Sequence, residues 1–224
     1  GAVSEVISGS AFDKTGYSDF APKLIITIDT GIVAHAGIES FRDAGIDVIV
    51  TDHHQPEITL PNANCFVHTI ATSGAGVAWI FSLALLGESA MKLLDLAVIG
   101  VVGDMMPLTG LNRSICAYGL KALSKSTRPG LLAMKVAMGV ASKALTTYDI
   151  SFGIAPRINA AGRIYSPLDA LRLLCTSDAK LAGELATKIE SHNKDRQEYT
   201  DNALKNAIST KADHKVIVII GDYH

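Results

Sequence analysis

The 224-residue chain lacks an excess of charge of one sign, a closely spaced pair of cysteines and any long, uninterrupted hydrophobic run. Twenty lysines and arginines stand against 22 aspartates and glutamates, which gives a formal net charge of −2. That balance excludes a uniformly polybasic nucleic-acid binder. It is compatible with a few cationic side chains gathered in one cleft.

Cysteine is scarce, and the three cysteines are far apart. Cys65, Cys116 and Cys175 form no CxxC pair, so the sequence indicates reduced thiols and neither a disulfide framework nor a zinc knuckle. The first 14 residues contain no basic stretch followed by an apolar run, so no secretory leader is evident. We therefore expect a cytoplasmic protein.

Hydrophobic residues are abundant, but their runs are short. They make up 48% of the chain, which is enough for a sizeable core and excludes wholesale disorder. The two most apolar stretches, residues 77–86 and 93–102, fall short of the ~20 residues that span a bilayer. We predict that both are core helices and that the protein does not associate with membranes.

The order of predicted elements indicates an α/β fold. Residues 23–29 predict a buried strand, residues 33–44 predict a helix that ends at Gly45, and residues 46–50 predict a second strand. A strand, a helix and a strand joined by short connections form a βαβ unit, whose two strands are parallel. We therefore expect a parallel sheet flanked by helices.

The rest of the chain has a largely helical pattern after a loop rich in proline and asparagine at residues 55–64. Helices are predicted at residues 73–86, 89–102, 112–124, 130–138, 167–175 and 178–208. The last is long and charged along one side, which suits an exposed spacer. A final apolar strand at residues 215–220 would begin a second α/β domain.

Acidic and imidazole side chains follow both predicted strands. Asp29 follows the first strand, and Asp52, His53 and His54 follow the second. The carboxyl ends of parallel strands share one edge of the sheet, where ligands bind, so these side chains are expected to converge. Asp104 follows a buried helix and adds a carboxylate. Such oxygen and nitrogen ligands suit Mn²⁺, Mg²⁺ or Zn²⁺, and a shared aspartate is typical of two-metal phosphoryl hydrolysis.

Each of these residues also has a simpler interpretation. A single aspartate after a strand, such as Asp29, is most often a turn residue. Two adjacent histidines are usually solvent-exposed or form a packed polar contact, and Asp104 is also typical of a cap on the following turn. The isolated histidines, including His68, are interpreted as structural or surface residues.

Two further segments are candidates for phosphate binding. The first holds Arg157, Asn159 and Arg163 among small residues, and arginine matches phosphate oxygens with two parallel hydrogen bonds. The second is Ser73-Gly74, a predicted helix N-terminus with free amides. Surface salt bridges explain the arginines, and close helix packing explains the glycine, as alternatives.

Four motifs, in order, resemble the DHH phosphoesterase superfamily. They are LIITIDTGI at 24–32, VIVTDHHQP at 48–56, GDMMPL at 103–108 and APRINAAGRI at 155–164. The last is similar to the RecJ branch, the single-strand-specific 5′→3′ exonucleases of DNA repair and recombination. The resemblance implies a hydrolase that releases 5′-mononucleotides by in-line attack of activated water on a phosphodiester.

The resemblance also implies a role for each candidate residue. Asp29 would bridge two divalent cations, Mn²⁺ or Mg²⁺, with His53 and Asp104 as further ligands. His54 would contact the scissile phosphate, and Asp52 would orient a histidine from behind. The phosphate backbone of single-stranded DNA would be held by Arg157, Asn159 and Arg163, with Ser73 and Gly74 as further contacts.

The resemblance further implies a division of the chain. Residues 1–177 would be part of a DHH catalytic domain, 178–212 a connecting helix, and 213–224 the first strand of a truncated DHHA1-type domain. The family's Asp-x-Asp-Gly metal-binding cluster and its glycine-rich substrate loop are both missing from this sequence. We therefore expect the chain to be a fragment that is inactive by itself.

Two other functions stay open on the sequence alone. One is hydrolysis of short RNA, cyclic dinucleotides or pyrophosphate within the same superfamily, and the other is a non-catalytic nucleic-acid-binding relative. Family resemblance implies a monomer, with single-strand-binding protein and helicase as partners.

Overall fold

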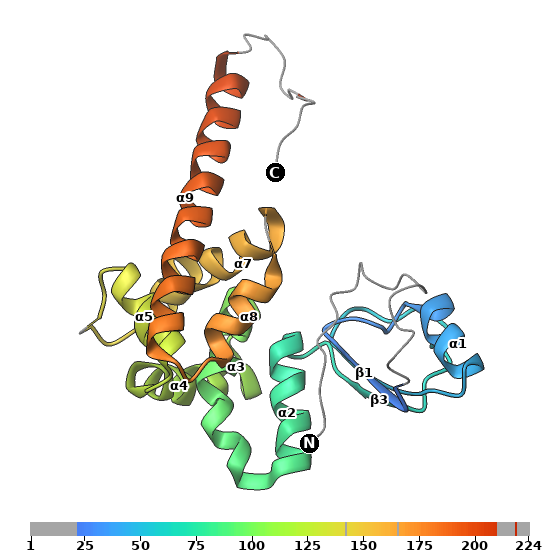
Figure 1. Cartoon of the computed structure of the whole chain (residues 1–224). Helices are drawn as coiled ribbons and strands as arrows, with labels where there is room; N and C mark the ends of the chain where they lie inside the picture. The colour runs from blue at the N-terminus through green and yellow to red at the C-terminus, as the bar shows by residue number, and fades with distance from the viewer. Residues whose placement is uncertain (1–21, 142, 165, 210–217, 219–224) are drawn as a thin grey trace. The chain divides into compact units, whose positions relative to one another are not determined.

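The computed structural model describes residues 22–141, 143–164, 166–209 and 218, without the side chains of residues 163, 164 and 209 (Figure 1). The chain divides into two compact units, Gly1–Leu123 (unit 1) and Ser124–His224 (unit 2). The strand predicted at residues 215–220 lies outside the described residues, apart from Val218.

Unit 1 contains a three-stranded parallel sheet in the order β1-β2-β3. The strands are β1 (Leu24–Ile28), β2 (Asp47–Asp52) and β3 (Cys65–His68). The predicted parallel pairing of the first two strands is confirmed. Strand β3 was not predicted, because its four residues are too few to show an alternating pattern after a loop rich in proline.

Helix α1 (His35–Asp43) connects β1 to β2 and packs against β2. Its buried residue Ile38 packs in a cluster with Val48 and Val50 of β2. The helix ends just before Gly45, which has a φ of +75°. Glycine adopts this left-handed conformation without steric cost, so the predicted end of the helix is confirmed.

The helical part of unit 1 covers the sheet through α2, which contacts β2 and β3. Its elements are α2 (Gly74–Leu86), the 3₁₀ helix η1 (Gly87–Leu93), α3 (Leu94–Gly103) and α4 (Gly110–Lys125), whose last two residues belong to unit 2. The prediction of one helix over residues 89–102 was wrong, because that stretch is divided into a 3₁₀ turn and an α-helix. Helix α3 is almost entirely buried, which explains its continuous apolar sequence.

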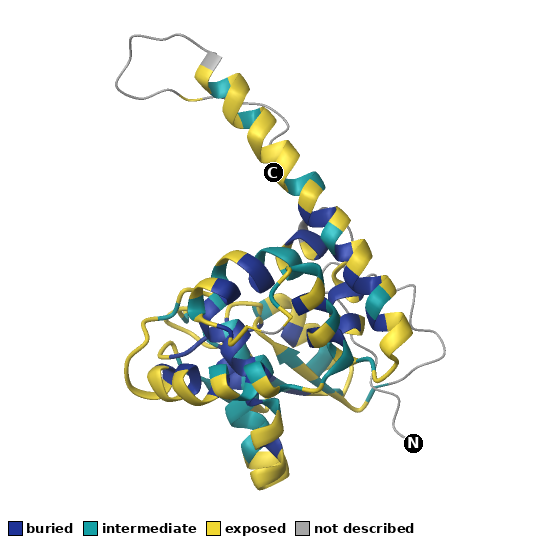
Figure 2. Ribbon diagram, turned by 90° about the vertical axis from the view of Figure 1, so that its left-hand side faces the viewer, coloured by how far each residue is buried: buried dark blue, intermediate teal, exposed yellow. Residues whose placement is uncertain are grey.

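All the regular secondary structure in the described residues of unit 2 is helical. Its elements are α5 (Pro129–Ala137), α6 (Thr147–Asp149), the π-helical turn η2 (Ile150–Ile154), α7 (Ala155–Ile164), α8 (Pro167–Cys175) and α9 (Ala179–Ser209). Helix α9 packs against α5, α7 and α8. Its buried residues lie in its first half, and beyond Asn193 it is mostly exposed (Figure 2). Searching the described helices for one with the length and apolarity of a membrane span finds none.

Candidate metal centre

Asp29 lies directly after β1, in a backbone conformation that is unusual for a residue other than glycine. Its φ is +60°, and its backbone N–H donates to Thr51 O of β2 at 2.9 Å. A left-handed aspartate is uncommon and is held there by the surrounding structure. This conformation allows the chain to turn sharply at the carboxyl end of β1.

The buried carboxylate of Asp52 holds the two strand ends together. Its side chain is 1% exposed, and Oδ2 accepts a hydrogen bond from Ile32 N at 2.9 Å. Oδ1 accepts from His53 N at 2.7 Å and from His54 N at 3.2 Å. Burial by itself would raise the pKa of this carboxyl, but these hydrogen bonds and one from the His54 side chain hold the pKa below 3.8. Asp52 is therefore a charged anchor beneath the edge of the sheet.

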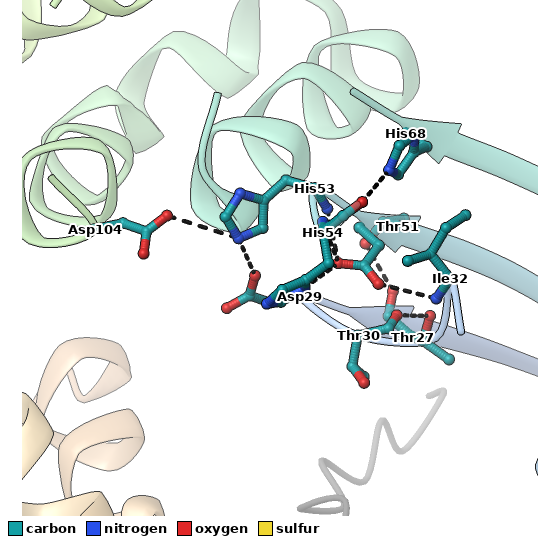
Figure 3. A network of polar contacts seen from close by, with 10 residues as sticks. Thr27, Asp29, Thr30, Ile32, Thr51, His53, His54, His68 and Asp104 are labelled. Atoms are coloured by element: carbon teal, nitrogen blue, oxygen red, sulfur yellow. Dashed lines mark hydrogen bonds and ion pairs between the residues drawn. The ribbon is translucent and has the colours of Figure 1, made fainter. Parts of the chain in front are cut away.

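The imidazole of His53 lies between two carboxylates (Figure 3). Its Nε2 is 3.1 Å from Asp29 Oδ1 and 3.6 Å from Asp104 Oδ2. The imidazole is 14% exposed, whereas the Asp29 and Asp104 side chains are 57% and 47% exposed. Partial burial raises the pKa of the Asp29 carboxyl, against the opposing effect of the neighbouring histidines. The three side chains converge, as the sequence predicts.

His54 lies beside His53 but faces a different partner. Its Nδ1 is 2.7 Å from Asp52 Oδ1, and its side chain is 58% exposed. The hydrogen bond to Asp52 raises the pKa of the His54 imidazole. With Nδ1 engaged by a carboxylate, Nε2 is the nitrogen left to meet a ligand. Oxygen and nitrogen atoms of Asp29, His53 and His54 lie within 4.8 Å of one another.

The N-terminus of α2 lies against Asp29. Ser73 caps this helix, since its Oγ accepts a hydrogen bond from Gly76 N at 3.2 Å. A Cβ atom on Gly74 would lie 2.0 Å from Asp29 Oδ1, so only glycine leaves room for the carboxylate. Gly74 thus has a steric role beside the site, which the sequence analysis did not identify.

The second predicted cluster lies in unit 2, and its backbone is not a loop. Residues 155–164 form helix α7. The alternative interpretation of the arginines, a salt bridge, is borne out for Arg157. The Arg157 Nε donates to Glu190 Oε2 at 2.6 Å and Nη1 donates to Gly153 O at 2.9 Å. Asn159 is exposed on the same helix, and the Arg163 side chain lies outside the described atoms.

His68, which the sequence analysis interprets as a structural or surface residue, contacts the polar loop after β2. Its Nε2 is 2.7 Å from His54 O. The residue closes β3, and β3 itself was missed, so no sequence signal placed His68 beside His54. Parallel pairing brings it there, because Asp52 and His68 are opposite each other in the register.

The donor set fits a divalent cation. In the part of the chain that the structure describes, neither Asp29 nor Asp104 pairs with a lysine or arginine. Two half-exposed carboxylates share one imidazole nitrogen, an arrangement in which a cation supplies the missing positive charge. Carboxylate and imidazole ligands of this kind suit Mn²⁺, Mg²⁺ or Zn²⁺.

Aspartate and histidine at adjacent strand ends of a parallel sheet form a site of the class that can hold a divalent cation. Residues 2–101 match the family model for the DHH family, N-terminal domain. This N-terminal part of the chain belongs to the DHH family.

Within that family, the chain is similar to single-stranded-DNA-specific exonucleases named RecJ. It is 38% identical over 209 residues to RecJ of Bacillus subtilis, covering 88% of this chain and 27% of that protein. It is 36% identical over 212 residues to RecJ of Thermus thermophilus, covering 89% of this chain and 31% of that protein. The chain thus spans less than a third of the length of these two relatives.

Solved structures give the same result. A crystal structure of Thermus thermophilus RecJ in complex with Mn²⁺ matches with a TM-score of 0.76 at 35% identity, over 84% of this chain and 30% of that one. A crystal structure of exonuclease RecJ bound to manganese also matches with a TM-score of 0.76, at 34% identity, over 85% of this chain and 51% of that one. The predicted fold class, a parallel sheet flanked by helices, is confirmed.

Proposed function

We propose that this chain is the metal-binding part of a phosphodiesterase that removes nucleotides from the 5′ end of single-stranded DNA. The observation that carries the proposal is the convergence of Asp29 and Asp104 on one nitrogen of His53. Similarity to RecJ proteins, which are single-stranded-DNA-specific exonucleases by name, supports the substrate class. RecJ structures with Mn²⁺ and Mg²⁺ support the choice of cation.

In this proposal, Asp29, His53 and Asp104 hold the divalent cation. When bound, the cation would lower the pKa of a water molecule and neutralise negative charge on the phosphate. Asp52 keeps His54 oriented through Nδ1, so that Nε2 faces a phosphate oxygen of the substrate. The raised pKa of His54 favours the protonated ring, which donates a hydrogen bond to that oxygen.

The remaining expectations are part of the same proposal. Asn159 and Arg163 on α7, and the amides after Ser73, are proposed contacts to the DNA backbone. Arg157 has a weaker case, because its guanidinium already pairs with Glu190. We further propose a cytoplasmic monomer with single-strand-binding protein and helicase as partners. We also propose that residues 1–177 and 178–212 are catalytic domain and connecting helix, and that the first strand of a DHHA1-type domain follows.

The test is an exchange of segments with a relative. The 209 matched residues of Bacillus subtilis RecJ are replaced by those of this chain, and digestion of 5′- and 3′-labelled single-stranded DNA is followed with Mn²⁺. We expect 5′-directed digestion by the chimera and its loss in Asp29→Ala, with Gly37→Ala as a control on exposed helix α1.

Two outcomes would contradict the proposal. A folded chimera with undiminished activity after Asp29→Ala removes the metal role from this residue. A chimera that hydrolyses short RNA or cyclic dinucleotides but leaves single-stranded DNA intact supports the alternative substrate class instead.

A further inference from the structure

Asn112 is a buried polar residue in the first turn of α4, and its side chain joins two distant segments. The residue is 2% exposed. Its Nδ2 donates one hydrogen bond to Ala71 O at 2.9 Å and a second to Pro107 O at 3.0 Å. Both amide hydrogens are therefore used, and each goes to a backbone carbonyl.

The two segments that Asn112 joins are the two sides of the candidate metal centre. Ala71 lies two residues before Ser73, which caps α2 at the glycine that lies against Asp29. Pro107 lies three residues after Asp104, whose carboxylate is 3.6 Å from His53. A single side chain thus bridges the backbone beside one proposed ligand and the backbone beside another.

The segment that carries Asp104 is held from its other end by α3. The N–H of Met105 donates to Val102 O at 3.1 Å, and the N–H of Met106 donates to Val101 O at 3.2 Å. Met105 has a φ of +56°, so α3 ends in a left-handed turn of the Schellman type. The Asp104 side chain is itself half exposed, so these backbone bonds and the Asn112 bond determine where it points.

Asparagine is the residue type that this position requires. Its side chain carries two N–H donors, so it bonds both carbonyls at once. Leucine would offer no donor, and aspartate would place a carboxylate against two carbonyl oxygens.

We propose that Asn112 is a positioning residue of the metal centre, which fixes Asp104 relative to Asp29 and His53 by clamping the 104–107 segment to the segment before α2. The expected effect of Asn112 on metal affinity rests on the proposed function. The clamp itself is independent of any metal.

The experiment uses this chain with Asn112→Ala and, as a matched control, Leu123→Ala. Leu123 is fully buried in the same helix and donates no hydrogen bond from its side chain, so its truncation weakens packing without removing the clamp. Two quantities are measured: amide hydrogen exchange by NMR, and Mn²⁺ affinity by electron paramagnetic resonance.

For Asn112→Ala we expect faster exchange confined to residues 69–73 and to the amides of Met105 and Met106, and Mn²⁺ affinity lower by about tenfold. For Leu123→Ala we expect exchange to rise across the whole of unit 1 and Mn²⁺ affinity to stay unchanged. In an Asp104→Asn background, Asn112→Ala should cause no further loss of affinity, because the clamp acts through Asp104.

The proposal is overturned if Asn112→Ala binds Mn²⁺ as the wild type does, or lowers affinity equally with and without Asp104. A wild-type chain that binds no Mn²⁺ contradicts the proposed function instead. In that case exchange alone decides the clamp: a rise confined to the two segments supports it, and a uniform rise across unit 1 refutes it.

Discussion

The acidic residues of the two units have different partners. At the metal centre of unit 1, Asp29 and Asp104 share one nitrogen of His53. In unit 2, three acidic side chains pair with lysine or arginine: Asp149 with Lys143, Glu190 with Arg157 and Asp169 with Lys188. The pKa directions agree, since partial burial raises the pKa of Asp29, while hydrogen bonds, first from Thr146 and then from Lys143, lower that of Asp149.

The difference separates charges that hold the fold together from charges available to a ligand. A carboxylate with a basic partner contributes to packing of its helix and needs nothing more. Carboxylates that crowd a single imidazole leave negative charge for a cation to neutralise. The same contrast applies to Arg157, whose pairing with Glu190 joins α7 to α9.

The largest effect is expected from Gly74→Ala. The new Cβ would overlap Asp29 Oδ1 and displace the carboxylate, so Mn²⁺ affinity should fall by about 100-fold, within the range seen when a ligand's support is lost. The measurement is a Mn²⁺ titration followed by electron paramagnetic resonance, with circular dichroism to verify the fold. Gly37→Ala is the control, because beyond its chain neighbours and the backbone of its own helix no atom lies within 4 Å of the added Cβ. Equal affinity in Gly74→Ala and wild type would show that Asp29 has room to move.

An intermediate effect is expected from breaking the pair in unit 2. Arg157→Ala leaves Glu190 partly buried without its partner, and should lower the free energy of unfolding by about 2 kcal/mol in urea. The double variant Arg157→Glu with Glu190→Arg should recover much of that loss, and neither should change Mn²⁺ affinity. An unchanged urea midpoint in Arg157→Ala, together with weaker DNA binding, would instead assign the arginine to the substrate.

The smallest effect is expected in the pH dependence of stability without metal. The folded-state pKa of Asp29 lies above 3.8, so wild type loses stability relative to Asp29→Asn as pH rises through that raised pKa. Asp149 has the opposite sign: its folded-state pKa lies below 3.8, so its contribution is present above pH 3.8 and is lost as pH falls through the folded value. Thermal unfolding of Asp29→Asn and Asp149→Asn from pH 2 to pH 7 measures both. If the stabilities of wild type and Asp29→Asn changed with pH in parallel, the raised pKa of Asp29 would be contradicted.

Local sequence patterns predicted the parts of the fold that depend on neighbours in the chain. The β-branched run of β1, the glycine after α1 and the Ser73 cap of α2 each determine their element locally. The convergence of Asp29 and His53 followed from parallel strand ends. None of these needed a long-range contact beyond one βαβ unit.

The features that sequence reasoning missed depend on distant partners. Strand β3 is defined by pairing with β2. The position of the Arg157 guanidinium is set by its hydrogen bond to Glu190, 33 residues away. The clamp of Asn112 reaches back 41 residues to Ala71. No local sequence pattern predicts such contacts, because a single asparagine in an amphipathic helix is predicted to be an exposed polar residue.

The most direct measurement is Mn²⁺ binding by the chain and by single variants from each unit. We predict that wild type binds Mn²⁺, that Asp29→Asn and Asp104→Asn each bind it at least about tenfold more weakly, and that Asp169→Asn binds it as wild type does. Binding that persists unchanged in Asp29→Asn, or that falls equally in Asp169→Asn, would contradict a metal centre built from the two carboxylates that share His53 in unit 1.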